Sequence, residues 1–205
     1  MKAILWMISV LGMAAAMVSC KPDEESLRGE AGFILDTTSR WTLADPDRLG
    51  VLSGSYEVFN DTMIEGVRWR QIGRNSREGW VLDCLLRQEG EQVYRYDAAS
   101  GEGLLVYDFD VAEGEQVTVY GLEGAETLTV EKVGDTVLPG GDGLPYRYVS
   151  LRSGDYRDVW VENMGSLRTG FYFFGTSTRL EGFIYDKRPG IHLYVNPEYA
   201  YLINE

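Results

Sequence analysis

Glycine recurs along this chain about once every ten residues, the spacing typical of short antiparallel strands joined by tight turns. The runs between these glycines are rich in Val, Tyr, Trp and Thr, which suit a pleated sheet. No run after residue 20 keeps a helical period. The glycines that we interpret as turn markers are Gly66, Gly90, Gly101, Gly114, Gly124, Gly134, Gly143, Gly154, Gly165 and Gly175.

Several of these runs alternate with period two, as a strand with one buried face does. In residues 105–111 the odd positions are apolar, so we expect Asp108 and Asp110 to lie on the wet face. The same alternation places Trp160 on a polar face between Asp158 and Glu162. The pattern predicts an all-β fold, an antiparallel meander forming a single barrel-like or sandwich domain after a signal peptide. The pattern does not distinguish a barrel from a sandwich.

The first residues have the layout of a secretory signal, with Lys2 before an uncharged apolar run over residues 3–18. That run is shorter than the roughly 20 residues needed to cross a bilayer, so a retained membrane anchor is the weaker alternative. The junction Ser19-Cys20 resembles the lipobox of bacterial lipoproteins, in which the cysteine sulfur carries the lipid. We predict a lipoprotein signal peptide over 1–19, a tether over 20–32 and an all-β domain over 33–205.

An acidic run, Asp23, Glu24 and Glu25, follows Cys20 closely. It resembles the export signal that sends Bacteroidota lipoproteins to the outer face of the outer membrane. The alternative is a solvated tether, because like charges repel and keep a segment extended. We therefore expect an outer-membrane protein that is bound to the membrane through Cys20 and faces the cell exterior, with a periplasm-facing anchor as the alternative.

The formal net charge of −13 disfavours nucleic acid as a partner, since phosphates require Lys and Arg. A hydrophobic content of 44% is that of a globular chain. Once Cys20 is acylated, Cys84 is the one cysteine left, and its apolar neighbours predict a small buried side chain. An intramolecular disulfide is then impossible.

Five short motifs resemble, in order, an uncharacterised β-rich domain common in secreted proteins and lipoproteins of Bacteroidota. They span residues 60–66, 91–97, 104–109, 159–166 and 193–199. Asn163-Met164 stands where that family usually has Gly-Ile. The resemblance implies a β-rich fold and an exported protein, and it implies no catalytic activity.

Residues with possible chemistry do not form a complete set in the sequence. Asp108 and Asp110 could be paired carboxylates of a glycosidase or a calcium site, but a solvated strand face explains them better. His192 is the single histidine, so it cannot form a two-histidine zinc site. The glycine-rich residues 139–143 lack the Lys-Ser/Thr of a phosphate loop and indicate a hairpin turn. We predict no catalytic residue, metal or cofactor.

Aromatic residues could instead form a sugar-stacking platform, because their rings offer apolar faces to carbohydrate C–H groups. Trp69 and Trp160 are our candidates for glycan stacking, but a β-protein of this size must also fill its core with such rings, and we expect Trp160 to be buried. Three Asp-Thr pairs also resemble the O-glycosylation motif of Bacteroidota. The acceptor residues would be Thr37, Thr62 and Thr136.

The function that these features favour is a non-enzymatic structural or interaction module on the cell surface, with a glycan or another surface protein as a possible partner. One alternative is a glycan-binding accessory lipoprotein of a polysaccharide-uptake system. The other is a hydrolase whose carboxylates come from distant strands.

Overall fold

The computed structural model describes residues 35, 39–44, 52–76, 79–121, 124–138, 143–171, 179–185 and 194–195. Within these ranges no helix is long and apolar enough to span a membrane. The signal peptide and the tether lie outside them, so both stay predictions. The individual candidate residues outside the described ranges are Cys20, Asp23, Glu24, Glu25, Thr37 and His192.

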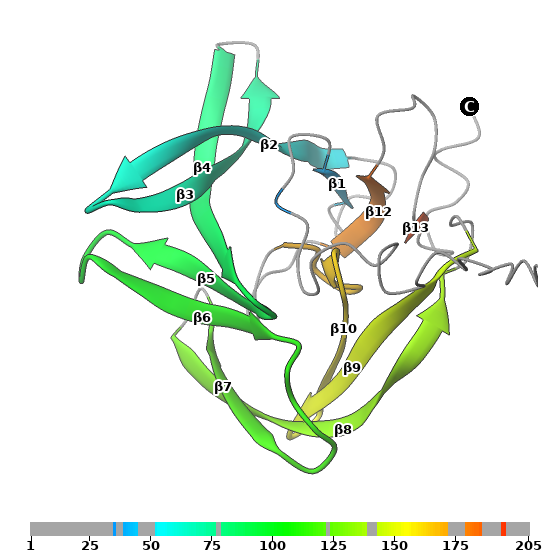
Figure 1. Ribbon diagram of the computed structural model, residues 1–205. Coiled ribbons are helices and arrows are strands. Elements are labelled where there is room, and N and C mark those ends of the chain that lie inside the picture. The colour runs from blue at the N-terminus through cyan, green and yellow to red at the C-terminus, as the bar shows by residue number, and fades with distance from the viewer. Residues whose placement is uncertain are drawn as a thin grey trace, which may run out of the picture.

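The described chain is all-β and forms two antiparallel sheets, each curled into a half-barrel (Figure 1). This confirms the predicted fold class. The strands of the first sheet are β1 (Ser39–Ala44), β2 (Leu52–Ile64), β3 (Val67–Ser76), β4 (Gly79–Glu89), β5 (Gln92–Asp97), β6 (Glu102–Asp108), β12 (Arg179–Tyr185) and β13 (Tyr194–Val195). Those of the second are β7 (Gln116–Tyr120), β8 (Ala125–Val137), β9 (Pro145–Ser153), β10 (Tyr156–Val161) and β11 (Gly165–Ser166).

Both sheets are meanders in which consecutive strands pair. The first has the order β13-β12-β1-β2-β3-β4-β5-β6, because β12 returns to pair with the outer side of β1. The second has the order β11-β10-β9-β8-β7. β8 and β9 pair up to Val137 and Pro145, and residues 139–142 of the predicted hairpin turn lie outside the described residues.

Eight of the ten predicted turn glycines have a positive φ, as tight turns between strands require. At the β2–β3 turn both central residues, Glu65 and Gly66, have positive φ, at 51° and 80°. Gly134 is a correction, because it lies inside β8 rather than in a turn. It pairs with Tyr148, and a Cβ at Gly134 would lie 3.1 Å from the Tyr148 ring. Gly175 lies outside the described residues.

The core fills the space between the two sheets, and side chains from both contribute to it. Residues predicted to be buried from their alternation, such as Val117 with Val119 and Leu128 with Val130, are buried. Cys84 packs against this core as a free thiol, and burial raises its pKa. The large aromatic side chains in the core are Trp41, Tyr56, Tyr107, Phe109, Tyr146, Trp160 and Phe171.

Candidate functional site

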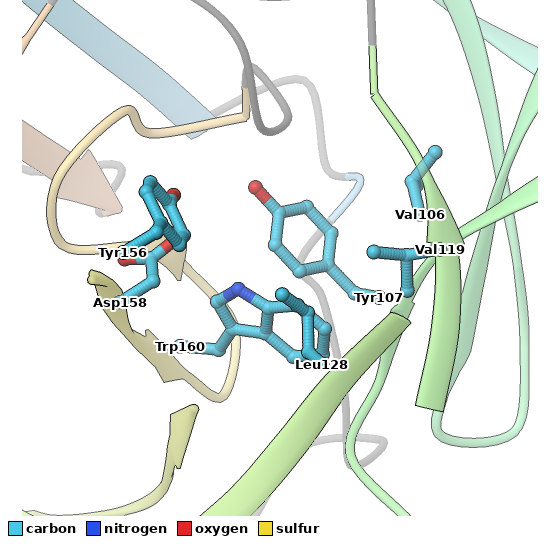
Figure 2. A pocket seen from close by; sticks show the side chains of 7 residues that line it. All are labelled: Val106, Tyr107, Val119, Leu128, Tyr156, Asp158 and Trp160. Carbon is cyan, nitrogen blue, oxygen red and sulfur yellow. The ribbon is translucent and has the colours of Figure 1, made fainter. Parts of the chain in front are cut away.

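A small cavity lies between the two sheets, where β10 of the second sheet faces β6 of the first (Figure 2). Tyr156 and Asp158 form one side of it, and the rings of Tyr107 and Trp160 lie between them and the aliphatic side. Its free volume is about 10 Å³, the lower limit for one water molecule. The cavity is therefore too small for a substrate. The lining residues are Val106, Tyr107, Val119, Leu128, Tyr156, Asp158 and Trp160.

Asp158 is the buried carboxylate of this site. Its Oδ1 accepts hydrogen bonds from Ser166 Oγ and the Val159 amide, each at 2.8 Å, and its Oδ2 accepts one from the Tyr156 hydroxyl at 3.1 Å. Burial raises the pKa of Asp158 to about 6, although these hydrogen bonds and one from Trp160 favour the ionised form. The carboxylate therefore titrates close to neutral pH.

Ser166 uses the full hydrogen-bonding capacity of its hydroxyl within the protein. The hydroxyl donates to Asp158 and accepts from the amides of Arg168 and Thr169, at 3.0 and 2.9 Å. A hydroxyl has one donor and two acceptor positions, so none is left for a ligand. Since Ser166 is also buried, its role is to hold the turn that follows it.

We call residues 162–171, which follow β10, the closing segment. Two aromatic residues of the first sheet bind it from the other side of the core. The Trp41 indole N–H donates to the Met164 carbonyl at 2.9 Å, and the Tyr107 hydroxyl donates to the Gly170 carbonyl at 2.7 Å. Burial also raises the pKa of Tyr107 well above its usual range. The polar groups around the cavity thus join the two sheets.

The two tryptophans proposed for glycan stacking are both buried, at 4% exposure for Trp69 and 3% for Trp160. Trp160 packs edge-on against Tyr107, with ring centroids 5.1 Å apart. The Arg87 guanidinium lies 4.9 Å from the Trp69 ring, and Tyr96 packs against the edge of that ring. Neither indole offers a face to a sugar, so the stacking role is wrong for these two residues.

The prediction of solvent-exposed strand faces is also partly wrong. Asp110 is exposed as expected, but Asp108 is buried. Asp108 accepts hydrogen bonds from Gln92 Nε2 at 2.7 Å and from the Asp110 amide at 2.9 Å, so it holds the end of β6 in place. Asp158 and Glu162 are likewise buried. Ser166 of the closing segment hydrogen-bonds Asp158, so that segment covers part of a face that simple alternation assigned to solvent.

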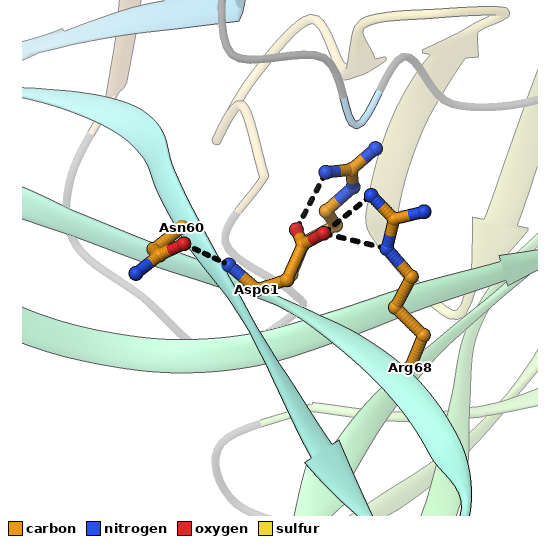
Figure 3. A network of polar contacts seen from close by, with 4 residues as sticks. Asn60, Asp61 and Arg68 are labelled. Atoms are coloured by element: carbon orange, nitrogen blue, oxygen red, sulfur yellow. Dashed lines mark hydrogen bonds and ion pairs between the residues drawn. The ribbon is translucent and has the colours of Figure 1, made fainter.

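A second polar cluster lies on the β2–β3 hairpin (Figure 3). The Asp61 carboxylate accepts hydrogen bonds from Arg70 Nη1 at 2.5 Å and Arg68 Nε at 2.6 Å, and also contacts Arg68 Nη2. Partial burial raises the pKa of Asp61, but the two arginines outweigh it and lower the pKa overall. All three side chains are at least a quarter exposed, so solvent weakens the pairs.

The two candidate O-glycosylation residues within the described ranges lie in strands. Thr62 is opposite Trp69 in the β2–β3 pair, and Thr136 is opposite Tyr146 in the β8–β9 pair. Both are half-buried. Modification at these positions stays a prediction.

No group of three or more His, Cys, Asp or Glu side chains in the described part of the chain is arranged to hold a metal ion. Comparisons with protein-family models, with curated proteins and with solved structures found no match to this chain. The resemblance to a Bacteroidota domain therefore stays a prediction. Asn163, where the chain departs from that pattern, has a φ of 69°, a left-handed conformation that favours glycine.

The burial of Trp160 predicts a large loss of stability when its ring is removed. Trp160→Ala should lower the free energy of unfolding by about 3–5 kcal/mol, through lost apolar transfer and a residual cavity. Met63→Ala, at an exposed position, is the control and should change it by less than about 0.5 kcal/mol. Denaturant unfolding followed by circular dichroism measures both. Equal midpoints for Trp160→Ala and wild type would contradict the buried placement.

The raised pKa of Asp158 predicts that the protein loses stability as the pH rises. The folded state binds this proton more tightly than the unfolded state, whose pKa is about 3.9. The stabilisation of the folded state by protonated Asp158 is thus fully present below about pH 4 and disappears as the pH rises through about 6. Between these values wild type should lose up to about 3 kcal/mol relative to Asp158→Asn, which cannot ionise. A difference in unfolding free energy that is constant from pH 4 to 7 would contradict the assignment.

Proposed function

We propose that this protein is a lipid-anchored cell-surface protein whose β-domain is a non-enzymatic interaction module. The observation that carries the proposal is where its exposed apolar side chains lie. Of seven large apolar side chains that are exposed in the described residues, five belong to the adjacent strands β2, β3 and β4. These five are Phe59, Met63, Val67, Val81 and Leu82.

Concentrations of exposed apolar side chains are typical of interaction surfaces, because water-exposed hydrocarbon is unfavourable unless a partner covers it. The same strands carry the β2–β3 turn well away from the second sheet (Figure 1). The buried polar groups of Asp158, Ser166 and Tyr107, by contrast, are used to join the sheets. This division of roles supports binding by the exposed side chains of β2, β3 and β4.

The sequence before the domain supports the anchor. The apolar run and Ser19-Cys20 are those of a lipoprotein signal, and two or more acyl chains give firm membrane attachment where one does not. The acidic residues after Cys20 favour the cell exterior over the periplasm. The membrane would then be one partner, and the ligand of the β-domain would be the other.

Replacing Cys20 tests the anchor. Cys20→Ala should abolish incorporation of labelled palmitate and release the protein from the membrane fraction, because the sulfur that carries the lipid is gone. Cys84→Ala is the matched control, since its thiol is packed against the core, and it should keep full labelling. Unchanged labelling in Cys20→Ala would overturn the proposed anchor.

A further inference from the structure

An aromatic pair with one exposed and one half-buried ring lies on the first sheet, on strands whose other face packs into the core. The Phe59 ring stacks on the Trp80 ring, with centroids 4.4 Å apart and an angle of 26° between the planes. Phe59 is 52% exposed and Leu82 is 49% exposed. Aromatic and aliphatic side chains at this level of exposure leave a large apolar area in contact with water.

The strand register shows which residues share this face. Gly73 of β3 lies opposite Glu57 of β2 and Leu82 of β4, and directly opposed residues project to the same side. Gln71, two residues before Gly73, lies opposite Asn60 and shares the face. The intervening residues Val58 and Ile72 project into the core.

The missing side chain of Gly73 leaves room for the Trp80 ring. A Cβ at this position would lie 2.5 Å from Trp80 Cζ2 and 2.2 Å from the Val81 carbonyl oxygen, so no other residue fits. Phe59 is the extra residue of an irregularity in the β2–β3 pairing, between Val58 and Asn60. This bulge lets the Phe59 ring reach Trp80. The pair is thus fixed by the backbone of three strands.

Polar groups suited to hydroxyls lie beside the rings. The Asn60 side-chain oxygen accepts a hydrogen bond from the Asp61 amide at 2.9 Å (Figure 3). Within the described residues, neither the side-chain NH₂ group of Asn60 nor the side-chain amide of Gln71 forms a hydrogen bond with the protein. A planar amide offers both donors and acceptors, which suits the paired donor and acceptor character of sugar hydroxyls.

The charge of this surface points to an uncharged ligand. We define the aromatic surface as Phe59, Asn60, Gln71, Trp80 and Leu82, none of which is charged. Glu57 at its border is paired with Arg40 at 3.0 Å. Because the whole chain carries a net charge of −13, it repels a polyanion and also a second copy of itself.

We propose that the aromatic surface binds a neutral carbohydrate. The exposed Phe59 ring, supported by Trp80, packs against the C–H face of a pyranose, and the amides of Asn60 and Gln71 hydrogen-bond its hydroxyls. This assigns a ligand class to the interaction module, so it rests on the function proposed above. It also moves sugar stacking from the buried Trp69 and Trp160 to a face that a sugar can reach.

The test is native affinity electrophoresis of the full-length protein in mild non-ionic detergent. The gels contain dextran, yeast mannan, xylan or hydroxyethylcellulose as neutral polysaccharides, or polygalacturonate as an acidic one. At least one neutral polymer should slow wild type, and polygalacturonate should not. Phe59→Ala should raise the apparent Kd by about tenfold, whereas Phe59→Tyr should retain binding. Val137→Ala removes an exposed apolar side chain at the end of β8 and should change nothing.

Three outcomes would overturn the proposal: no neutral polymer slows wild type, Phe59→Ala is slowed as much as wild type, or polygalacturonate alone slows it. Sedimentation of the same samples tests a second copy as the occupant. A dimer that Phe59→Ala abolishes, without retardation by any polysaccharide, would assign the surface to self-association instead. Acylation of Cys20 does not enter this measurement, so the sugar site and the membrane anchor can fail separately.

Discussion

Besides the shared core, the two half-barrels depend on the closing segment, because no described strand of one sheet pairs with a strand of the other. The first sheet binds this segment through Trp41 and Tyr107. In the second sheet, Asp158 of β10 binds it by accepting a hydrogen bond from Ser166. Phe171, at its end, packs against the rings of Trp41 and Tyr56. A buried carboxylate is costly in such a place, and here its hydrogen bonds to Ser166, Val159 and Tyr156 offset the cost. The polar residues most similar to a catalytic set are therefore the ones that hold the core together.

Much of the fold could be predicted because it is encoded locally. Glycines at positive φ mark the turns, and alternation identified the buried side chains of β7 and β8. The errors share one cause: alternation shows which residues lie on the same face, but not whether a distant segment covers that face. Asp108 was assigned to solvent for this reason, and alternation alone put Trp160 on a polar face that the rings of Tyr107 and Phe109 cover. The prediction of a turn at Gly134 was wrong for a different reason. A glycine that lies under an aromatic ring within a strand looks the same in the sequence as a glycine in a turn.

The candidate binding surface was less predictable than the fold. Phe59 lies in an irregularity of the β2–β3 pairing, where period two does not apply, and its partner Trp80 comes from a different hairpin. The two tryptophans that were candidates for stacking are covered, Trp69 by Arg87 and Tyr96 and Trp160 by the core. In the described part of the chain, apolar exposure, aromatic stacking and side-chain amides without a protein partner coincide on the outer face of β2, β3 and β4.

The closing segment is a structural connection and does not open to admit a ligand. Amide hydrogen exchange of the full-length protein tests this directly, because it compares local opening with global unfolding. The account predicts that the amides of Ser166, Leu167 and Gly170, which are hydrogen-bonded within the protein, exchange as slowly as those of the core strands and only through global unfolding. Exchange of this segment through a separate, lower-energy opening, with the core strands still protected, would contradict it.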